Sequence, residues 1–408
     1  MADLSLARGA ALAPGAAPRY DPRMGTSQSH EVLLAELAAL EPSLRARLAA
    51  VAFDPAWLVT RAKTLRAVPE GTDVNRVRGP VRAPRPEEVA PLPPVGDPAR
   101  ARLAEAGEVA LRAGELALCV LAGGMATRMG SVVKALVEIR PGITFLDVRL
   151  AEQRALTARA GRAVPLWLMT SDATDAPIRR ALAERDAPPE VTTFRQGVAL
   201  RLTRDGSLFR DAHGAPSVYA TGHGDLVDAI RAAGVLDRFK SGGGRALLIA
   251  NLDNLGASLD PAYAGALFEH GAQLLVEVCR KEPGDKGGVP VELDGRLQVL
   301  EEFRLPPGFD ATTVPVFNTN TMWVRADALA EVRVPWSWFL VEKQVDGRPA
   351  IQFERLLQEL TGVLQTRYVE VPRSGDEARF LPVKDPGELD RRRPVLEALL
   401  RARGLLQG

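Results

Sequence analysis

Four short apolar runs alternate with helical segments between residues 116 and 280, and this alternation constrains the fold more than any other feature. The runs are LALCVLA, VPLWLMT, ALLIANLD and LLVEVCR. Each has the length of a buried strand, and longer amphipathic stretches separate them. We therefore expect an α/β fold with a mixed, mainly parallel sheet and helices on both faces. Helices are predicted over residues 143–160, 175–186, 224–239 and 260–272, and a β-hairpin at Asp294-Gly295.

The regions outside this alternation differ in composition. Residues 1–30 are rich in Ala, Gly, Pro and Ser and lack a continuous apolar core, so they are expected to form a flexible tail rather than a signal peptide. Residues 31–78 have helical spacing, with proline at two expected helix starts. Seven prolines in residues 79–100 exclude a helix and predict an extended strap. We place the main domain at residues 101–335 and a short α+β segment that completes it at 336–408.

Charge and cysteine content narrow the class of protein. The 408 residues include 52 basic and 51 acidic side chains, a formal net charge of +1, which argues against a general nucleic-acid or membrane-surface binder. No apolar run is long enough to span a bilayer. The two cysteines, Cys119 and Cys279, lie in apolar runs and are expected to be buried thiols in a reducing compartment, the cytoplasm.

A glycine-rich loop, LAGGMATRMG, follows the first apolar run. Gly123 and Gly124 allow backbone N–H groups to approach an anion, while Thr127, Arg128 and Lys134 add hydroxyl and cationic donors. The spacing matches neither the dinucleotide fingerprint nor the Walker loop. The loop therefore predicts a phosphate site, and a turn required only for packing is the alternative.

The segment GHGD places a histidine between two glycines. Asp225 is expected to cap the following helix, which leaves His223 as a donor beside a helix N-terminus and a phosphorylated ligand. The alternative is a structural histidine in a loosened turn.

Polar residues end the run ALLIANLD. Asn251, Asp253 and Asn254 present oxygen atoms at the carboxyl edge of the expected sheet, and Asp253 is the best candidate to hold Mg²⁺. An Asx-rich turn is the alternative.

Two further segments carry candidate ligand groups. Asn318 and Asn320, in FNTNTMW, share one face if extended and suit the hydroxyls of a sugar, although a hydrogen-bonded strand edge explains them equally well. Lys384, in FLPVK, follows an apolar run. We expect it to be partly buried and to need an anionic partner.

In this order, the segments resemble the UDP-sugar pyrophosphorylase family, which includes UTP–glucose-1-phosphate uridylyltransferases and UDP-N-acetylhexosamine pyrophosphorylases. The resemblance covers about residues 116–390 through LAGGMATRMG, FRQ, GHGD, NLDNLG, KGG, FNTNTMW and LPVK. It implies a Rossmann-like nucleotide-diphospho-sugar transferase fold and Mg²⁺-dependent uridylyl transfer from UTP to a sugar 1-phosphate, with glucose 1-phosphate as the first expectation. The alternatives are N-acetylglucosamine 1-phosphate as substrate and a non-catalytic nucleotide-sugar-binding protein.

The resemblance also implies roles for individual residues, although Val133 replaces the proline that usually precedes the loop lysine. The nucleotide would be bound by Ala122, Gly123, Gly124, Thr127, Gln196 and Gly222. The sugar phosphate would be bound by His223, Asn251, Asn318 and Asn320. The metal would be held by Asp253, and the catalytic cations would be Arg128, Lys134 and Lys384.

Overall fold

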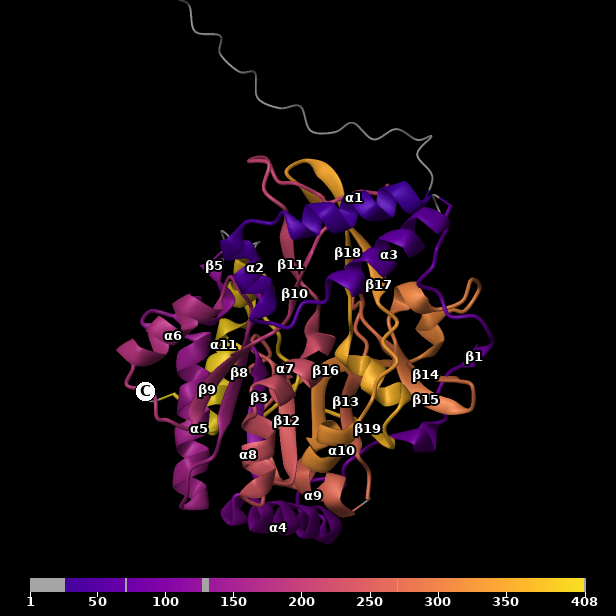
Figure 1. The fold of residues 1–408 in the computed structure, drawn as a ribbon. Helices are drawn as coiled ribbons and strands as arrows, with labels where there is room; N and C mark the ends of the chain where they lie inside the picture. The colour runs from indigo at the N-terminus through magenta and orange to yellow at the C-terminus, as the bar shows by residue number, and fades with distance from the viewer. Residues whose placement is uncertain (1–25, 70–71, 127–131, 270, 407–408) are drawn as a thin grey trace, which may run out of the picture.

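An eight-stranded sheet forms the centre of the molecule (Figure 1). The computed structural model describes residues 26–69, 72–126, 132–269 and 271–406. The strand order is β2 (Val89–Pro91), β19 (Thr366–Glu370), β13 (Leu274–Arg280), β16 (Val316–Arg325), β12 (Ala246–Asn251), β3 (Leu116–Leu121), β8 (Leu166–Thr170) and β9 (Val191–Arg195). Only β16 runs antiparallel to its neighbours in this sheet, so the mixed, mainly parallel arrangement is confirmed.

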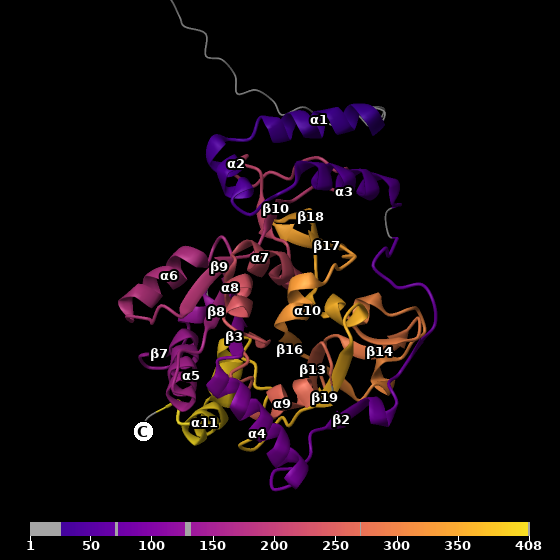
Figure 2. The same ribbon diagram turned by 60° about the horizontal axis from the view of Figure 1, so that its bottom comes forward.

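Helices cover both faces of the sheet (Figure 2). One layer consists of α7 (Leu226–Ala232), α8 (Val235–Ser241) and α10 (Ala326–Glu331), and the opposite layer of α4 (Pro98–Ala113), α5 (Phe145–Ala160), α9 (Pro261–Glu269) and α11 (Pro386–Ala402). The helix α6 (Asp175–Glu184) contacts β9. The single helix expected over residues 224–239 is wrong: Gly234 has a φ of +65°, a left-handed conformation that separates α7 from α8.

Two glycines permit close contact between α4 and α9. A Cβ on Gly107 would lie 1.8 Å from the Pro261 carbonyl oxygen, and one on Gly265 would lie 1.9 Å from that of Leu103. Neither position has space for a side chain, so the two helices approach with backbone against backbone.

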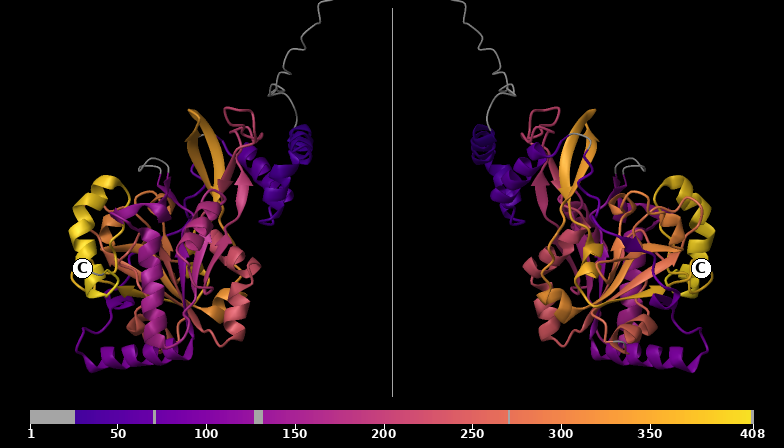
Figure 3. Two further views of the ribbon diagram at one scale, coloured as in Figure 1. Left: turned by 90° about the vertical axis from the view of Figure 1, so that its left-hand side faces the viewer. Right: turned by 90° about the vertical axis from the view of Figure 1, so that its right-hand side faces the viewer.

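The N-terminal helices α1 (Thr26–Ala38), α2 (Pro42–Ala49) and α3 (Pro55–Ala67) lie beyond one end of the sheet (Figure 3). They share an apolar cluster, separate from the main core, with strands β10 (Val198–Leu200), β11 (Val218–Ala220), β17 (Phe339–Val345) and β18 (Arg348–Glu354). Leu33 and Leu58 contribute from the helices, and Leu200, Ile351 and Phe353 from the strands. Proline occupies the first turn of both α2 and α3, as predicted.

The proline-rich segment adds one edge strand to the central sheet and one strand to a separate three-stranded sheet. Its β1 (Val81–Arg82) pairs with β14 (Val289–Leu293), and its β2 pairs with β19. The strand β15 (Arg296–Leu300) completes the hairpin predicted at Asp294-Gly295, where both residues have positive φ. Two short pairs follow β3: β4 (Met125–Ala126) with β5 (Val132–Val133), and β6 (Glu138–Arg140) with β7 (Ile143–Thr144).

Both thiols, Cys119 and Cys279, are buried and unpaired. Within the described ranges, no helix has the length and apolar character needed to cross a bilayer.

Candidate functional site

The predicted site residues gather where parallel strands end. Because β3, β8, β9 and β12 run in the same direction, the loops after them meet at one edge of the sheet. A cavity of about 360 Å³ lies there. It is lined by Leu121, Gly123, Gly124, Lys134, Met169, Gln196, Ala220, Gly222, His223, Asn251, Leu252, Asp253 and Glu354.

A second cavity, of about 240 Å³, adjoins the first. Asn251 and Asp253 line both. The second cavity is also lined by Asn254, Lys286, Gly287, Gly288, Glu301, Phe317, Asn318, Thr319, Asn320, Phe380, Pro382 and Lys384. The structure thus brings the glycine loop, GHGD, NLDNLG, FNTNTMW and LPVK to one paired cavity. Thr127 and Arg128 lie outside the described residues.

Gln196 follows β9 and lies against the glycine loop. Its backbone N–H donates to the Thr170 carbonyl at 2.9 Å, and the residue is only 6% exposed. A Cβ on Gly123 would lie 2.5 Å from Gln196 Nε2, so this glycine permits the amide to approach the loop. Ala122 does not line the cavity: it is buried, its N–H donates to the Met169 carbonyl, and its carbonyl accepts from the Thr174 hydroxyl.

His223 is held as a neutral ring. The Leu357 backbone N–H donates to His223 Nδ1 at 3.0 Å, and burial lowers the pKa of the ring to about 4. Since Nδ1 accepts, the proton lies on Nε2, which remains a hydrogen-bond donor. Gly222 has a φ of +92° and no space for a Cβ, which would lie 2.4 Å from the Arg355 carbonyl oxygen.

The expected helix cap at Asp225 is wrong. Its side chain makes no capping bond to α7. It accepts instead from the Gly197 backbone N–H and pairs with the Arg355 guanidinium. A short-range pattern identified the helix start, but the carboxylate is used by groups distant in sequence.

Lys134 Nζ pairs with the Asp253 carboxylate between the two cavities. The loop that carries Asp253 is fixed by the buried guanidinium of Arg149. Arg149 donates to the carbonyls of Asn254 and Ala257 at 2.7 Å each and to that of Asn251 at 3.2 Å. Three carbonyls bound by one side chain hold the loop in place beneath the cavity, and sequence reasoning did not find this arginine.

The expectation that Asn254 offers a ligand oxygen is wrong. This residue is 1% exposed, its Oδ1 accepts from the Leu381 N–H at 2.8 Å, and its Nδ2 donates to the Arg379 carbonyl at 3.0 Å. It therefore ties NLDNLG to FLPVK. Lys384, expected to be partly buried, is exposed at the rim of the second cavity.

Asn318 and Asn320 lie together at a bulge of β16 opposite Glu277 and Val278. Asn318 Nδ2 donates to Asn320 Oδ1 at 2.8 Å, and Asn320 adopts a left-handed φ of +56°. Both amides line the second cavity, but the bulge places them there and not the extended strand on which the prediction from their spacing relied.

Two carboxylates in the lining were missed by sequence reasoning. Glu301 lines the second cavity, accepts from the Gln358 amide, and has its pKa raised by burial. Glu354 lines the first cavity and accepts from the Gln352 amide. Glu301 directly follows β15 and Glu354 is the last residue of β18, and the alternating polarity of these segments is the signal that was available in the sequence.

In the described part of the chain, few metal-binding side chains lie at the junction of the two cavities. Among the described residues no group of three or more His, Cys, Asp or Glu side chains is placed to hold an ion. The junction instead offers the single carboxylate of Asp253 beside Asn251. Mg²⁺ is commonly held by one or two carboxylates and completes its shell with water and substrate phosphates, so the residues fit Mg²⁺ that binds together with a nucleotide.

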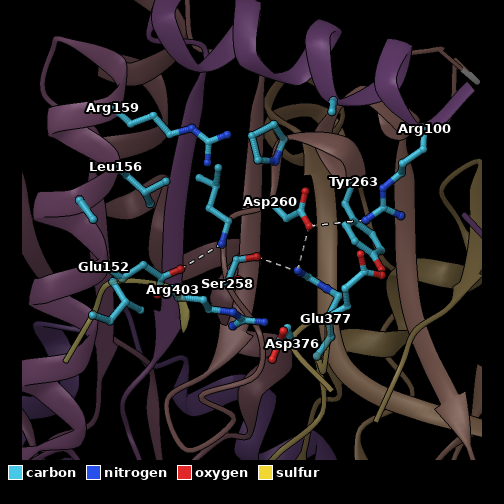
Figure 4. Close-up of a pocket in the computed structure, with 16 residues that line it drawn as sticks. Arg100, Glu152, Leu156, Arg159, Ser258, Asp260, Tyr263, Asp376, Glu377 and Arg403 are labelled. Atoms are coloured by element: carbon cyan, nitrogen blue, oxygen red, sulfur yellow. Dashed lines mark hydrogen bonds and ion pairs between the residues drawn. The ribbon is translucent and has the colours of Figure 1, made fainter. Parts of the chain in front are cut away.

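A third cavity, of about 420 Å³, opens between α4, α5 and α9 (Figure 4). Several of its charged side chains bind one another or the backbone: Arg379 donates to the Ser258 carbonyl at 2.8 Å, and Asp260 lies 3.7 Å from Arg100. Glu152 accepts from the Leu259 N–H at 3.0 Å. These contacts hold the chain between NLDNLG and α9, and no predicted site residue lies here.

The sheet, the glycine loop and the paired polar cavity define an α/β protein with its candidate site at the carboxyl edge of a mainly parallel sheet. The family profile described as UTP–glucose-1-phosphate uridylyltransferase matches residues 83–391. This chain belongs to that family. A UTP–glucose-1-phosphate uridylyltransferase of Musa acuminata is 32% identical over 302 residues, which cover 67% of this chain and 62% of the relative. That of Hordeum vulgare is 30% identical over 298 residues, with 67% and 61% covered. The chain thus spans about three fifths of the length of these relatives.

Solved structures show the same fold. The UDP-N-acetylglucosamine pyrophosphorylase of Trypanosoma brucei has a TM-score of 0.70 at 20% identity, with 89% of this chain and 81% of that chain covered. A UDP-glucose pyrophosphorylase of Leishmania major, in complex with UDP-glucose, has a TM-score of 0.62 at 22% identity, with 90% and 78% covered. The expected nucleotide-diphospho-sugar transferase fold is therefore confirmed.

Proposed function

We propose that this chain transfers a uridylyl group from UTP to glucose 1-phosphate and forms UDP-glucose and pyrophosphate with the help of Mg²⁺. One observation carries the proposal: two cavities of different lining share Asn251 and Asp253. The first cavity suits a nucleotide and the second a sugar phosphate. A phosphoryl group at their junction would have the rest of the nucleotide on one side and the sugar phosphate on the other. In-line transfer requires this arrangement.

In the proposed reaction a phosphate oxygen of the sugar 1-phosphate attacks the α-phosphorus of UTP. The new P–O bond forms as the bond to the β-phosphate oxygen breaks, and pyrophosphate leaves with that electron pair. The nucleophile is already anionic near neutral pH, so no general base is needed. Lys134 and Lys384 would stabilise the charge on the phosphates. Mg²⁺, held by Asp253, supplies further neutralisation of that charge when bound.

The remaining residues orient the substrates. Gln196 presents its amide to the uracil, with Gly123 and Gly222 at the base. His223 Nε2–H donates to a phosphate oxygen. In the second cavity Asn318, Asn320 and the carboxyl of Glu301 bind hydroxyls of the sugar. We also propose a cytoplasmic location, which the two unpaired thiols support.

The test is a substrate panel. Purified protein, Mg²⁺ and UTP are incubated with glucose 1-phosphate, N-acetylglucosamine 1-phosphate and galactose 1-phosphate in separate reactions, and pyrophosphate release and UDP-sugar formation are measured. We expect the highest kcat/KM with glucose 1-phosphate. Turnover without a sugar phosphate would indicate hydrolysis and contradict the proposal.

The second candidate is UDP-N-acetylglucosamine synthesis, because the structural likeness extends to a pyrophosphorylase of that name. A preference for N-acetylglucosamine 1-phosphate in the same panel would favour it. UTP binding without turnover on any sugar would favour a non-catalytic nucleotide-sugar-binding protein.

A further inference from the structure

One wall of the first cavity, which we call the nucleotide cavity after its proposed ligand, consists of two segments that are distant in sequence. Gln196 and Gly197 follow β9, whereas Gly222 and His223 follow β11. The strands β10 and β11 pair directly behind them, and the Thr221 N–H donates to the Gly197 carbonyl at 3.4 Å. The β10–β11 pairing thus ends at Val198 and Ala220, and beyond it the two segments are joined by long contacts to the Gly197 carbonyl, so other groups add to their support.

The backbone of a third segment, Glu354 to Leu357, supplies part of that support. The Arg355 N–H donates to the Thr221 carbonyl at 2.8 Å, and the Arg355 carbonyl accepts from the Gly224 N–H at 3.0 Å. A Cβ on Gly224 would lie 2.8 Å from the Arg355 carbonyl carbon, so the GHGD loop packs directly on this backbone.

The Arg355 side chain joins the two wall segments. Its guanidinium pairs with the carboxylate of Asp225, next to His223, and with that of Asp228. The Asp225 carboxylate in turn accepts from the backbone N–H of Gly197, next to Gln196. The side chains of Arg355 and Asp225 are 8% and 6% exposed, so the pair is largely shielded from solvent, and loss of Arg355 leaves the buried Asp225 carboxylate without its cationic partner.

Two tryptophan rings pack against the Arg355 guanidinium. It lies over the ring of Trp338 at 4.7 Å and over that of Trp336 at 5.3 Å. Trp338 contacts Trp57 of α3, with ring centroids 4.4 Å apart. The N-terminal helices therefore contact the guanidinium through two tilted indole rings, Trp57 against Trp338.

We propose that Arg355 is a positioning residue that holds Gln196 and His223 in register with each other, and so sets how the proposed enzyme recognises the base of UTP. Arg355 does not line the nucleotide cavity and acts through Asp225 and the loop backbone. The role in base recognition rests on the proposed function, whereas the positioning of the two segments does not.

Amide hydrogen exchange of the full chain tests the positioning directly. In Arg355→Met, peptides that cover residues 196–200 and 221–226 are expected to exchange about tenfold faster or more, since the Gly197 N–H loses its fixed acceptor. The matched control is Arg82→Gln, which removes another arginine that pairs with two carboxylates, Glu88 and Glu292, outside this wall. Unchanged exchange in a folded Arg355→Met protein would overturn the proposal.

Kinetics test the consequence for base recognition. Arg355→Met is expected to lower kcat/KM for UTP by about 10- to 100-fold, mainly through KM, and to reduce the preference for UTP over CTP. Arg355→Lys keeps the charge without the planar fork and is expected to restore part of the affinity. Faster exchange with unchanged KM and base preference would leave Arg355 a purely structural residue and overturn the proposal.

Failure of the proposed function and failure of the positioning role give different results in these experiments. If wild-type protein does not use UTP at all, the proposed function fails, while the exchange measurement still decides the positioning. If Arg355→Met does not fold, Gly197→Ala replaces it, because the new Cβ would lie 2.9 Å from Asp225 Oδ2 and displace the carboxylate without removing a charge. The same faster exchange and weaker base preference are then expected, and their absence would overturn the proposal.

Discussion

Lys134 Nζ and the carboxylate of Asp253 form an ion pair although 119 positions separate them in the sequence. The two side chains are 17% and 16% exposed, so each partly shields the other from solvent. In the proposed reaction the lysine binds phosphate and the carboxylate holds Mg²⁺, so both groups would be needed by the ligands. Ligand binding is therefore expected to replace the pair by two new contacts.

Asp253→Asn tests the metal assignment. The variant keeps the shape of the side chain but loses the charge, so we expect turnover to fall about 10²- to 10³-fold and the Mg²⁺ concentration for half-maximal rate to rise. Pyrophosphate release in a Mg²⁺ titration measures both, and chelation of the metal should abolish the wild-type rate. Asp294→Asn, at the exposed hairpin turn, is the control. An unchanged Mg²⁺ requirement in Asp253→Asn would refute the assignment.

Lys384→Ala tests the cation at the rim of the second cavity. Removal of a charge that stabilises the transferred phosphates should slow turnover by about 10²- to 10³-fold with little change in stability, because the side chain is exposed. Single-turnover rates with the sugar phosphate at saturation measure the effect. Lys343→Ala, on exposed β17, should keep the wild-type rate. A wild-type rate in Lys384→Ala would remove this residue from the mechanism.

Gly123→Ala tests the close approach of the glycine loop to Gln196. The added methyl group would lie 2.5 Å from Gln196 Nε2 and push the amide out of place, so KM for UTP should rise about tenfold or more. Gly242→Ala is the control, because its nearest neighbours would lie 3.4 Å away. Equal KM values for the two variants would show that Gln196 does not depend on this contact.

The low pKa of His223 predicts that the free energy of unfolding falls as the pH is lowered. The ring has an ordinary value of 6.5 in the unfolded chain and about 4 in the folded one, so below about pH 6.5 the unfolded state binds a proton that the folded state does not. The free energy of unfolding should therefore fall between pH 6.5 and 4, by up to about 3 kcal/mol from this residue. Urea denaturation of wild type and His223→Gln measures the difference. The variant should show a shallower decline, and exposed His213→Gln should behave as wild type.

Leu58→Ala tests the attachment of the N-terminal helices. Leu58 is 0% exposed in the cluster shared with β10 and β18, so its truncation should cost about 2–5 kcal/mol of unfolding free energy. Val32→Ala, at a residue 39% exposed on α1, should cost less than 1 kcal/mol, roughly. Equal urea midpoints would mean that the helices contribute no stability to the strands beneath them.

The sequence was informative where a local pattern also determines the neighbours in space. The run that became β12 predicted Asn251 and Asp253 at the sheet edge, because parallel strands place their carboxyl ends together. Asn254 was misjudged because its amide binds the backbone at Arg379 and Leu381, which no local pattern reveals. Arg149 and Arg355 were missed for the same reason, because each acts on partners far along the chain.

The two apolar clusters divide the site between them. The strands β10 and β11, next to Gln196 and the GHGD loop, pack with the N-terminal helices, whereas β9, β12 and β16 belong to the main core. The paired cavity thus follows a seam between two separately packed bodies. Because a seam deforms at lower cost than either core, we expect the substrates of the proposed reaction to enter and leave through a small motion across it that keeps both cores intact.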